Sequence, residues 1–192
     1  MKRRPGRLRI IGGAWRSRLI DVQGGAELRP TPDRVRQTLF DWLAPRIEGA
    51  TALDLFAGSG ALGLEALSRG AAHVTFVERE AAAADAIRAA VARFGAQDRA
   101  EVIHGDALRF LQALAGARSF ELVFLDPPYG SGLLEAALPL VPRVLAPEHR
   151  VYLEWPGHEA PALPAGWSLL KTKRAGRVSY GLATRSDQGA DP

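Results

Sequence analysis

Short apolar segments alternate with helical segments between residues 51 and 125, and this alternation constrains the fold more than any other feature. The segments with strand character are Ala52–Phe56, Val74–Glu78, Ala100–His104 and Leu122–Leu125. The helical segments between them end at glycines, which commonly cap the C-termini of helices. Such alternation predicts a parallel, doubly wound α/β sheet. A chain of 192 residues is about the size of one such domain.

The residues before this region predict a small hairpin. Two short strands, Leu8–Ile11 and Arg18–Val22, flank Gly12 and Gly13, and Trp15 is placed at the tip or edge. We expect the hairpin to form an extension over residues 1–30, before a main domain over residues 31–185 and a polar, frayed tail over residues 186–192.

A helix is predicted after the hairpin. Thr31 is expected to be its N-cap and Pro32 its first residue, with the helix running to Leu43. In this interpretation Arg34 and Arg36 lie off the apolar stripe.

The C-terminal part adds one interrupted helix and three strands. Pro139 and Pro142 are expected to break the helical pattern that begins at Leu133. The strands are predicted at Val151–Trp155, Trp167–Thr172 and Val178–Thr184, and the basic turn 173–177 separates the last two.

Positive charge is concentrated at the start of the chain. The net charge is +4, and seven basic residues precede the first acid, Asp21: Lys2, Arg3, Arg4, Arg7, Arg9, Arg16 and Arg18. This cluster suits a phosphate backbone, although charge alone fits a solvated arm equally well.

A glycine-rich loop follows the first strand of the alternating region. Gly58, Gly60 and Gly63 satisfy a dinucleotide-binding pattern, with Glu78 positioned to bind a ribose hydroxyl. The pattern alone does not separate a nicotinamide cofactor from S-adenosylmethionine. Asp54 favours S-adenosylmethionine, because a carboxylate at this loop repels a pyrophosphate and binds an ammonium group.

A second acidic position follows the third strand. Asp106 precedes Ala107 at the same edge of the predicted sheet. Two interpretations stay open, and both can hold at once: Asp106 accepts a hydrogen bond from an adenine amino group, or it caps the next helix.

The sequence Asp126-Pro127-Pro128-Tyr129 after the fourth strand carries the clearest chemical signal. An aryl amine is a weak nucleophile because its lone pair is delocalised into the ring. Asp126 and the Pro127 carbonyl would localise that pair by accepting both amino hydrogens, since Pro128 favours an extended Pro127. Tyr129 would stack on the base.

Together these motifs resemble the class I amino-methyltransferases. Within them, Arg9–Arg16 and Leu28–Leu43 look like the RsmD family, and the resemblance runs from about residue 7 to residue 182. It implies a seven-stranded, mostly parallel sheet with an antiparallel last strand. It also implies methyl transfer from S-adenosylmethionine to N2 of one guanine in 16S ribosomal RNA, within an assembling small subunit.

The resemblance also assigns roles to residues. Asp126, Pro127, Pro128 and Tyr129 form the catalytic loop. The cofactor-binding set is Asp54, Phe56, Ala57, Gly58, Ser59, Gly60, Glu78, Arg79, Asp106, Ala107 and Asp126. The charge and the position of the basic hairpin indicate that this part of the chain contacts RNA. The expected substrate-binding residues are Arg9, Arg16, Arg34 and Tyr129.

Three rival functions stay open at this stage. A DNA adenine or cytosine methyltransferase uses the same loop but normally adds a target-recognition region, for which this chain has little room. A nicotinamide-dependent oxidoreductase leaves residues 126–129 and the hairpin unexplained. A non-catalytic RNA-binding chaperone does not require the catalytic motifs.

Composition narrows the remaining possibilities. The chain has no cysteine, and its four histidines share no metal-ligand spacing, so no metal is expected. No apolar run approaches the roughly 20 residues that span a bilayer, and no signal peptide is evident, so we expect a cytoplasmic protein without a membrane partner.

Overall fold

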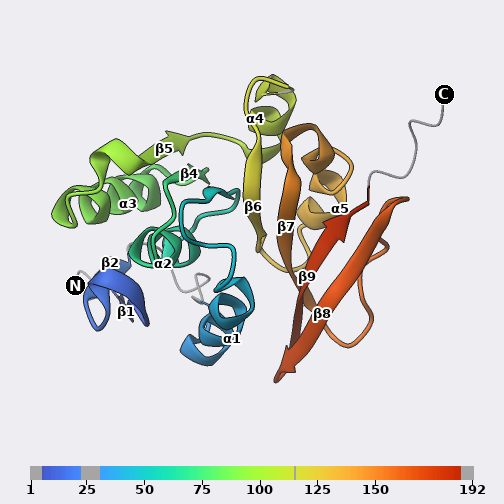
Figure 1. Ribbon diagram of the computed structural model, residues 1–192, viewed down its shortest axis with the longest axis horizontal. Coiled ribbons are helices and arrows are strands. Elements are labelled where there is room, and N and C mark those ends of the chain that lie inside the picture. The colour runs from blue at the N-terminus through green and yellow to red at the C-terminus, as the bar shows by residue number, and fades with distance from the viewer. Residues whose placement is uncertain (1–5, 23–30, 115, 187–192) are drawn as a thin grey trace.

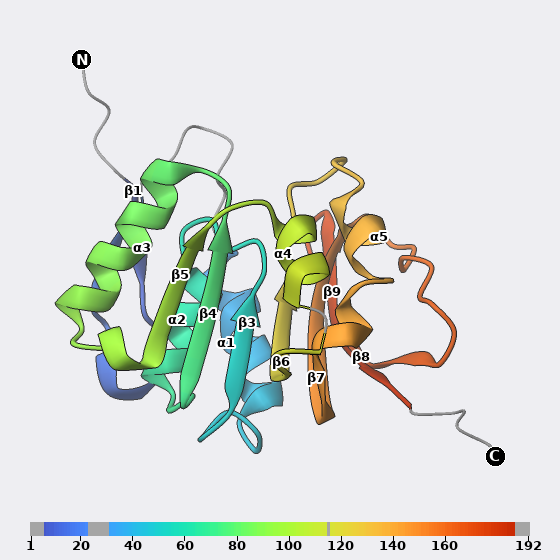
Figure 2. The same cartoon turned by 90° about the horizontal axis from the view of Figure 1, so that it is seen from above.

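The computed structural model describes residues 6–22, 31–114 and 116–186, and Figures 1 and 2 show its arrangement. The strands are β1 (Gly6–Arg9), β2 (Leu19–Val22), β3 (Thr51–Asp54), β4 (His73–Glu78), β5 (Ala100–His104), β6 (Phe120–Leu125), β7 (Leu145–Pro156), β8 (Trp167–Ala175) and β9 (Val178–Arg185). The α-helices are α1 (Asp33–Leu43), α2 (Ala61–Ser68), α3 (Ala81–Arg93), α4 (Ala107–Leu114) and α5 (Leu133–Ala137). Short 3-10 turns are η1 (Gly13–Trp15), η2 (Gln97–Arg99) and η3 (Val141–Val144).

The predicted doubly wound sheet is confirmed. Seven strands lie in the order β5-β4-β3-β6-β7-β9-β8, and β1 and β2 form a separate antiparallel hairpin. Strands β3 to β7 pair in parallel, whereas β9 is antiparallel to both of its neighbours. Because the chain moves outward from β3 in one direction and from β6 in the other, the switch point lies between these two strands.

Helices cover both faces of the sheet, and each face has its own apolar core (Figure 2). One core joins residues of the hairpin with α1, α2 and α3, and it includes Leu8, Ile20, Leu39, Leu64 and Ile87. The other core joins α4, α5 and η3 and includes Leu111, Leu134 and Val144. The hairpin therefore packs into the same core as the main domain.

The glycine and proline predictions are confirmed. Gly70 and Gly95 follow α2 and α3 with φ angles of 100° and 65°, the left-handed conformation that glycine adopts without strain. Helix α5 ends at Ala137, before Pro139 and Pro142. Residues 187–192 of the expected tail and Lys2, Arg3 and Arg4 lie outside the described residues.

Two predictions for the N-terminal region are wrong. Thr31 does not cap α1, because its hydroxyl donates to Oδ2 of Asp126 at 3.1 Å and the cap position is occupied by Pro32. Arg36 does not lie off the apolar stripe: its side chain is fully buried, and its Nη1 lies 3.6 Å from Oε2 of Glu65. Both partners come from distant segments, so the local helical pattern does not reveal them.

Trp15 is a core residue rather than an exposed tip. Its ring is buried and stacks on Phe94 at a centroid distance of 4.6 Å. The strands of the hairpin also end further from the turn than predicted, so nine residues, 10–18, connect them. None of the helices within the described residues is long and apolar enough to cross a membrane.

A buried carboxylate attaches the hairpin to the domain. Glu65 of α2 accepts hydrogen bonds from the backbone N–H groups of Ile11 and Gly12, both at 2.8 Å, and from Nε of Arg69 at 2.7 Å. It also faces the guanidinium of Arg36, which donates to the carbonyls of Thr31 and Arg9.

We expect Glu65→Ala to lower the free energy of unfolding by about 3 to 5 kcal/mol, because Arg36 would lose its buried counter-charge and keep only the exposed Asp33, and the N–H groups of Ile11 and Gly12 would lose their acceptor. Urea unfolding measures this change. The control is Glu48→Ala, which removes an exposed acid and should cost about 0.5 kcal/mol or less. A loss below about 1 kcal/mol for Glu65→Ala would show that the carboxylate does not hold the hairpin.

Candidate active site

The carboxyl edge of the sheet gathers the acidic residues that the sequence singled out. Asp54 ends β3, Glu78 ends β4 and Asp126 follows β6 directly. The register aligns Asp54 with Phe76 on one side and with Phe124 on the other, so these strand ends meet at one level. Asp54 and Asp126 flank the switch point, where open α/β sheets bind ligands.

Two glycines shape the loop between β3 and α2. Gly60 caps α2 with φ 74°, in the left-handed region that favours glycine. At Gly63, an added Cβ would lie 2.2 Å from the Phe76 ring, so only glycine lets α2 pack this closely on β4. The remaining loop residues of the predicted set, Phe56, Ala57, Gly58 and Ser59, lie between Asp54 and Gly60.

Hydrogen bonds fix the two acids beside this loop. Oδ2 of Asp54 accepts from the Gly63 backbone N–H at 2.9 Å, and Oε2 of Glu78 accepts from the Gly58 N–H at 2.6 Å. Asp54 is 3% exposed. Burial raises the pKa of Asp54 from 3.8 to about 7, the Gly63 hydrogen bond opposes this rise, and the charge of Glu78 adds to it.

Asp106 lies at the same edge, after β5, and its helix-capping role is confirmed. Oδ1 accepts from the Arg109 backbone N–H at 2.9 Å, three residues on, and α4 begins at Ala107. The side chain is exposed, so it has further acceptor capacity. Arg79, which follows Glu78, is also exposed and pairs with Glu80 at 3.6 Å.

The catalytic loop predicted from the sequence is anchored at both ends. Asp126 accepts from Thr31, as described above, and the Pro128 carbonyl accepts from the hydroxyl of Ser131 at 2.6 Å. No hydrogen bond from the described residues reaches the carbonyl oxygen of Pro127. Tyr129 is 52% exposed, although its hydroxyl donates to Oε2 of Glu154 at 3.0 Å.

Glu154 is the site residue that sequence reasoning missed. It lies on β7, is 4% exposed, and accepts from the Tyr152 hydroxyl at 2.6 Å as well as from Tyr129. Because Glu154 lies two residues before the end of a strand, the sequence alone does not distinguish it from an ordinary polar residue at a strand end. The only available signal was an acid in the otherwise apolar strand 151–155.

Glu154 and Asp126 form a carboxyl pair. Burial is the main cause of the raised pKa of Asp126, and the negative charges of Glu154 and Asp54 add to it. Burial also raises the pKa of Glu154, opposed by hydrogen bonds from Tyr152 and Tyr129. Their titrations are therefore linked, because ionisation of one carboxyl raises the cost of ionising the other.

A hollow of about 330 Å³ lies between the hairpin and the start of α1. It is lined by Arg7, Leu8, Arg9, Leu19, Thr31, Pro32 and Asp33. Of these residues Thr31 donates to Asp126, so the hollow borders the site through this side chain. Arg34 is exposed on the first turn of α1 and directly follows Asp33, which lines the hollow.

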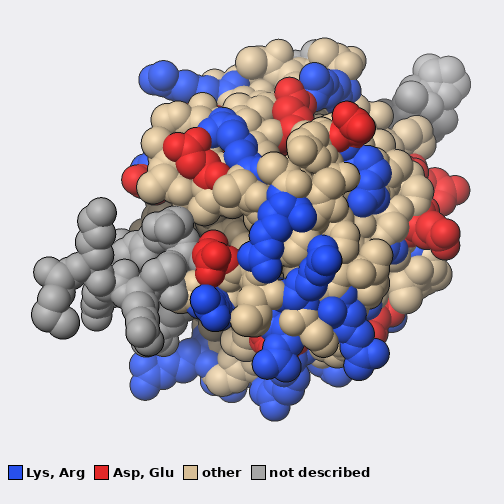
Figure 3. Space-filling model, turned by 90° about the vertical axis from the view of Figure 1, so that its left-hand side faces the viewer, with Lys and Arg blue, Asp and Glu red and all other residues tan. Residues whose placement is uncertain are grey.

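Arg16 lies at the opposite end of the hairpin. The preceding Trp15 donates its backbone N–H to Oγ of Ser68, the last residue of α2, whereas the glycine loop precedes α2. An eight-residue helix is roughly 12 Å long, so the structure does not bring Arg16 into the site. Figure 3 shows this side of the molecule, where basic side chains gather with few acids between them.

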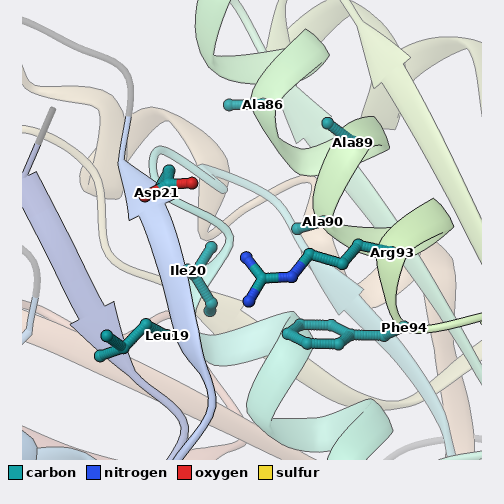
Figure 4. Close-up of a pocket in the computed structure, with 8 residues that line it drawn as sticks. All are labelled: Leu19, Ile20, Asp21, Ala86, Ala89, Ala90, Arg93 and Phe94. Carbon is teal, nitrogen blue, oxygen red and sulfur yellow. The ribbon is translucent and has the colours of Figure 1, made fainter.

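A second hollow, of about 190 Å³, lies between the hairpin and α3 (Figure 4). Small residues of α3, among them Ala86, Ala89 and Ala90, line one side, and Leu19, Ile20 and Asp21 line the other. Arg93 extends into it above Phe94. None of the acids at the sheet edge borders this hollow, so it belongs to the packing of the hairpin.

Comparison with known proteins supplies the family. The family described as conserved hypothetical protein 95 matches residues 8–184. Ribosomal RNA small subunit methyltransferase D of Escherichia coli strain K12 is 46% identical over 187 residues, which are 96% of this chain and 93% of that protein. Its Haemophilus influenzae counterpart is 42% identical over 180 residues, covering 92% and 93%. The chain belongs to the ribosomal RNA small subunit methyltransferase D family.

Solved structures of similar proteins agree with the fold of this methyltransferase D family member. The protein yhhF of Escherichia coli has a TM-score of 0.85 and 47% identity, covering 95% of this chain and 100% of that one. The protein HI0767 of Haemophilus influenzae has a TM-score of 0.79 and 40% identity, covering 93% and 98%. The family and the class I fold expected from the sequence are thus confirmed. Among the described residues, no group of three or more potential ligands could hold a metal ion.

The raised pKa of Asp54 predicts how pH affects stability. Between its ordinary 3.8 and about 7, the folded protein binds more protons at Asp54 than the unfolded chain does, so this residue makes stability fall as pH rises through that window. Asp54→Asn keeps an oxygen for the Gly63 N–H and removes the charge. We therefore expect the variant to gain stability over the wild type as pH rises from 4 to 8, by at most about 4 kcal/mol.

Urea unfolding of both proteins across this pH range measures the gain. Asp85→Asn is the matched control, because Asp85 is exposed and no pH-dependent gain is expected there. If the difference between Asp54→Asn and the wild type were the same at pH 4 and pH 8, the buried charge would not be the cause.

Proposed function

We propose that this protein transfers a methyl group from S-adenosylmethionine to the exocyclic N2 of one guanine in 16S ribosomal RNA. The observation that carries the proposal is Asp126, held by Thr31 beside Tyr129 and facing the glycine loop across the switch point. The names of the methyltransferase D relatives support ribosomal RNA as the substrate class. The choice of guanine N2 rests on the family resemblance and on the amine chemistry of the loop. With this substrate, we infer that the enzyme acts in the cytoplasm.

The residues around the glycine loop fit S-adenosylmethionine. Asp54 is a buried carboxylate whose raised pKa a cationic ammonium group would lower again, and Glu78 presents a carboxylate where a ribose is expected. Asp106 keeps acceptor capacity for the adenine amino group while it caps α4. The proposed cofactor-binding set is completed by Phe56, Ala57, Gly58, Ser59, Gly60, Arg79, Ala107 and Asp126. When bound, the cofactor supplies a methyl group on a sulfonium, which is a strong electrophile.

The catalytic loop acts on the acceptor amine. Asp126 and the Pro127 carbonyl each accept one amino hydrogen, which localises the nitrogen lone pair toward the methyl group. The bound cofactor would supply the methyl group to this lone pair, and the methylated amine would then release one proton, which the Asp126 carboxylate could accept. Tyr129 stacks on the base, a contact worth about 1 to 3 kcal/mol in single-stranded complexes. Most of the catalysis is positioning.

Glu154 would act as a positioning residue in this scheme. It holds the Tyr129 hydroxyl and thereby fixes the aromatic ring at the rim of the site.

The hairpin would dock the RNA. Arg9 lines the hollow that leads to Thr31, Arg34 lies at the start of α1, and Arg16 extends the basic surface along the hairpin. Phosphates contacted by these side chains would hold the strand while the base enters the site. The substrate partner is expected to be 16S RNA within an assembling small subunit.

We expect Arg9→Ala/Arg16→Ala to weaken RNA binding and to flatten its salt dependence, by a slope of about 0.7 per lost single-strand phosphate contact. Filter binding at several salt concentrations measures this slope. The affinity for S-adenosylmethionine should stay unchanged, which controls for folding. A slope equal to that of the wild type would contradict the docking role.

The function itself is tested by methyl transfer. Small ribosomal subunits that lack the modification are incubated with labelled S-adenosylmethionine and the protein, and the nucleosides are then separated. Labelled N2-methylguanosine is the expected product. Transfer to adenine or cytosine in DNA instead would leave the fold and the loop chemistry standing but overturn the proposed substrate.

Asp126→Ala is expected to reduce methyl transfer by at least about 100-fold, because one of the two acceptors that localise the lone pair is lost. Binding of S-adenosylmethionine should persist, because Asp54, Glu78 and Asp106 of the cofactor-binding set are unchanged. Isothermal titration measures the binding, and single-turnover transfer measures the chemical step. Near-normal turnover in this variant would remove Asp126 from the mechanism.

A further inference from the structure

A second basic hairpin lies on the far side of the catalytic loop from β1 and β2. Strands β8 and β9 are joined by the turn at residues 176–177, and Ala175 pairs with Val178, which in turn pairs with Pro156 at the end of β7. Because β7 runs parallel to β6, its end lies at the carboxyl edge of the sheet. The β8–β9 turn therefore lies at the same edge as Asp126.

The strand register places one lysine in line with the site. Glu154 pairs with Tyr180, and Tyr180 pairs with Lys173, so these three residues form one row across β7, β9 and β8. Leu125 pairs with Leu153, so Asp126 continues the same row beyond β6. Four neighbouring strand positions span roughly 14 Å from Asp126 to Lys173. The extended side chain of Lys173 and a nucleotide bound at Asp126 would together span most of this distance.

The side chains of this row lie on the face that α1 covers. Paired residues in a ladder point to the same face of a sheet. Tyr180 contacts Trp42 of α1 at 5.7 Å between ring centroids, so Lys173 points to this face. Lys171 lies two positions before Lys173 on β8 and therefore points to the same face. Its Nζ lies 5.9 Å from the centre of the Trp42 ring.

The surface beside this row is positively charged and exposed. Its cationic side chains on β8 and the β8–β9 turn are Lys171, Lys173 and Arg177. Within the part of the chain that the structure describes, none of the three forms an ion pair with an acid. Lys171 and Lys173 therefore remain available for a polyanion.

We propose that Lys171, Lys173 and Arg177 form a second RNA-docking surface, which binds phosphates on the side of the target nucleotide opposite to the N-terminal hairpin. The proposal rests on the proposed function in that it takes RNA as the partner. A strand held on both sides of residues 126–129 has its base presented to the catalytic loop with its flanking phosphates fixed. The two hairpins thus bracket one nucleotide.

The test is charge reversal at Lys173 with a matched control. Arg143→Glu makes the same change in charge at an exposed arginine in η3, which precedes β7 and so lies at the opposite edge of the sheet. For Lys173→Glu we expect Kd for small subunits to rise about tenfold and the salt slope to fall by about 1 or more. Lys173→Arg keeps the positive charge and should have the Kd and the salt slope of the wild type. Arg143→Glu should leave both quantities unchanged.

Binding and methyl transfer are measured separately, so that the two proposals fail in different ways. If the wild type binds subunits but transfers no methyl group to RNA, the proposed function fails and the Kd comparison still decides the docking surface. If Lys173→Glu and Arg143→Glu have equal Kd values and equal salt slopes, the second docking surface is overturned. Competition by duplex DNA as effective as that by RNA would overturn its assignment to RNA.

Discussion

A single buried carboxylate, Glu65, joins three elements on which the site depends. It accepts hydrogen bonds from the hairpin backbone and faces Arg36, and Arg36 donates to the carbonyl of Thr31 at 3.2 Å. Thr31 in turn donates to Asp126. The attachment of the hairpin and the orientation of the catalytic aspartate are therefore one connected network. Buried charges of this kind are costly unless paired, so the network holds these segments in one arrangement.

The acids at the sheet edge oppose the stability that this network provides. Asp54, Asp126 and Glu154 are close enough for the charge of one to raise the pKa of another, and burial raises all three pKa values. Hydroxyl donors and one backbone N–H offset part of the cost. The site that we propose for a cation and an amine has reason to keep uncompensated negative charge, because such ligands would supply the missing partners. The buried acids therefore lower the stability of the folded protein at the positions that the proposed chemistry uses.

The parts that the sequence predicted are those governed by local pattern. The strand and helix periods, the glycines after α2 and α3, the prolines after α5 and the residue set at the carboxyl edge all follow from neighbours within a few positions. Arg36, Thr31 and Glu154 do not. Each has a partner at least 25 positions away: Glu65 lies 29 positions from Arg36, Asp126 lies 95 from Thr31, and Tyr129 lies 25 from Glu154. A helix pattern therefore assigned Arg36 to solvent, and a capping rule assigned Thr31 to the wrong partner.

The antiparallel strand β9 leaves the outer part of the sheet open beside the edge that carries Asp126. Had β8 followed β7 through a parallel crossover, a helix would have covered the outer part of the sheet. Instead β9 lies between β7 and β8, and the short turn at its start stays at the catalytic edge. On the α1 side, Lys171 and Lys173 consequently remain exposed beside Trp42 and Tyr180. The inversion of one strand thus turns the last part of the sheet into an open basic surface in the same row as Asp126.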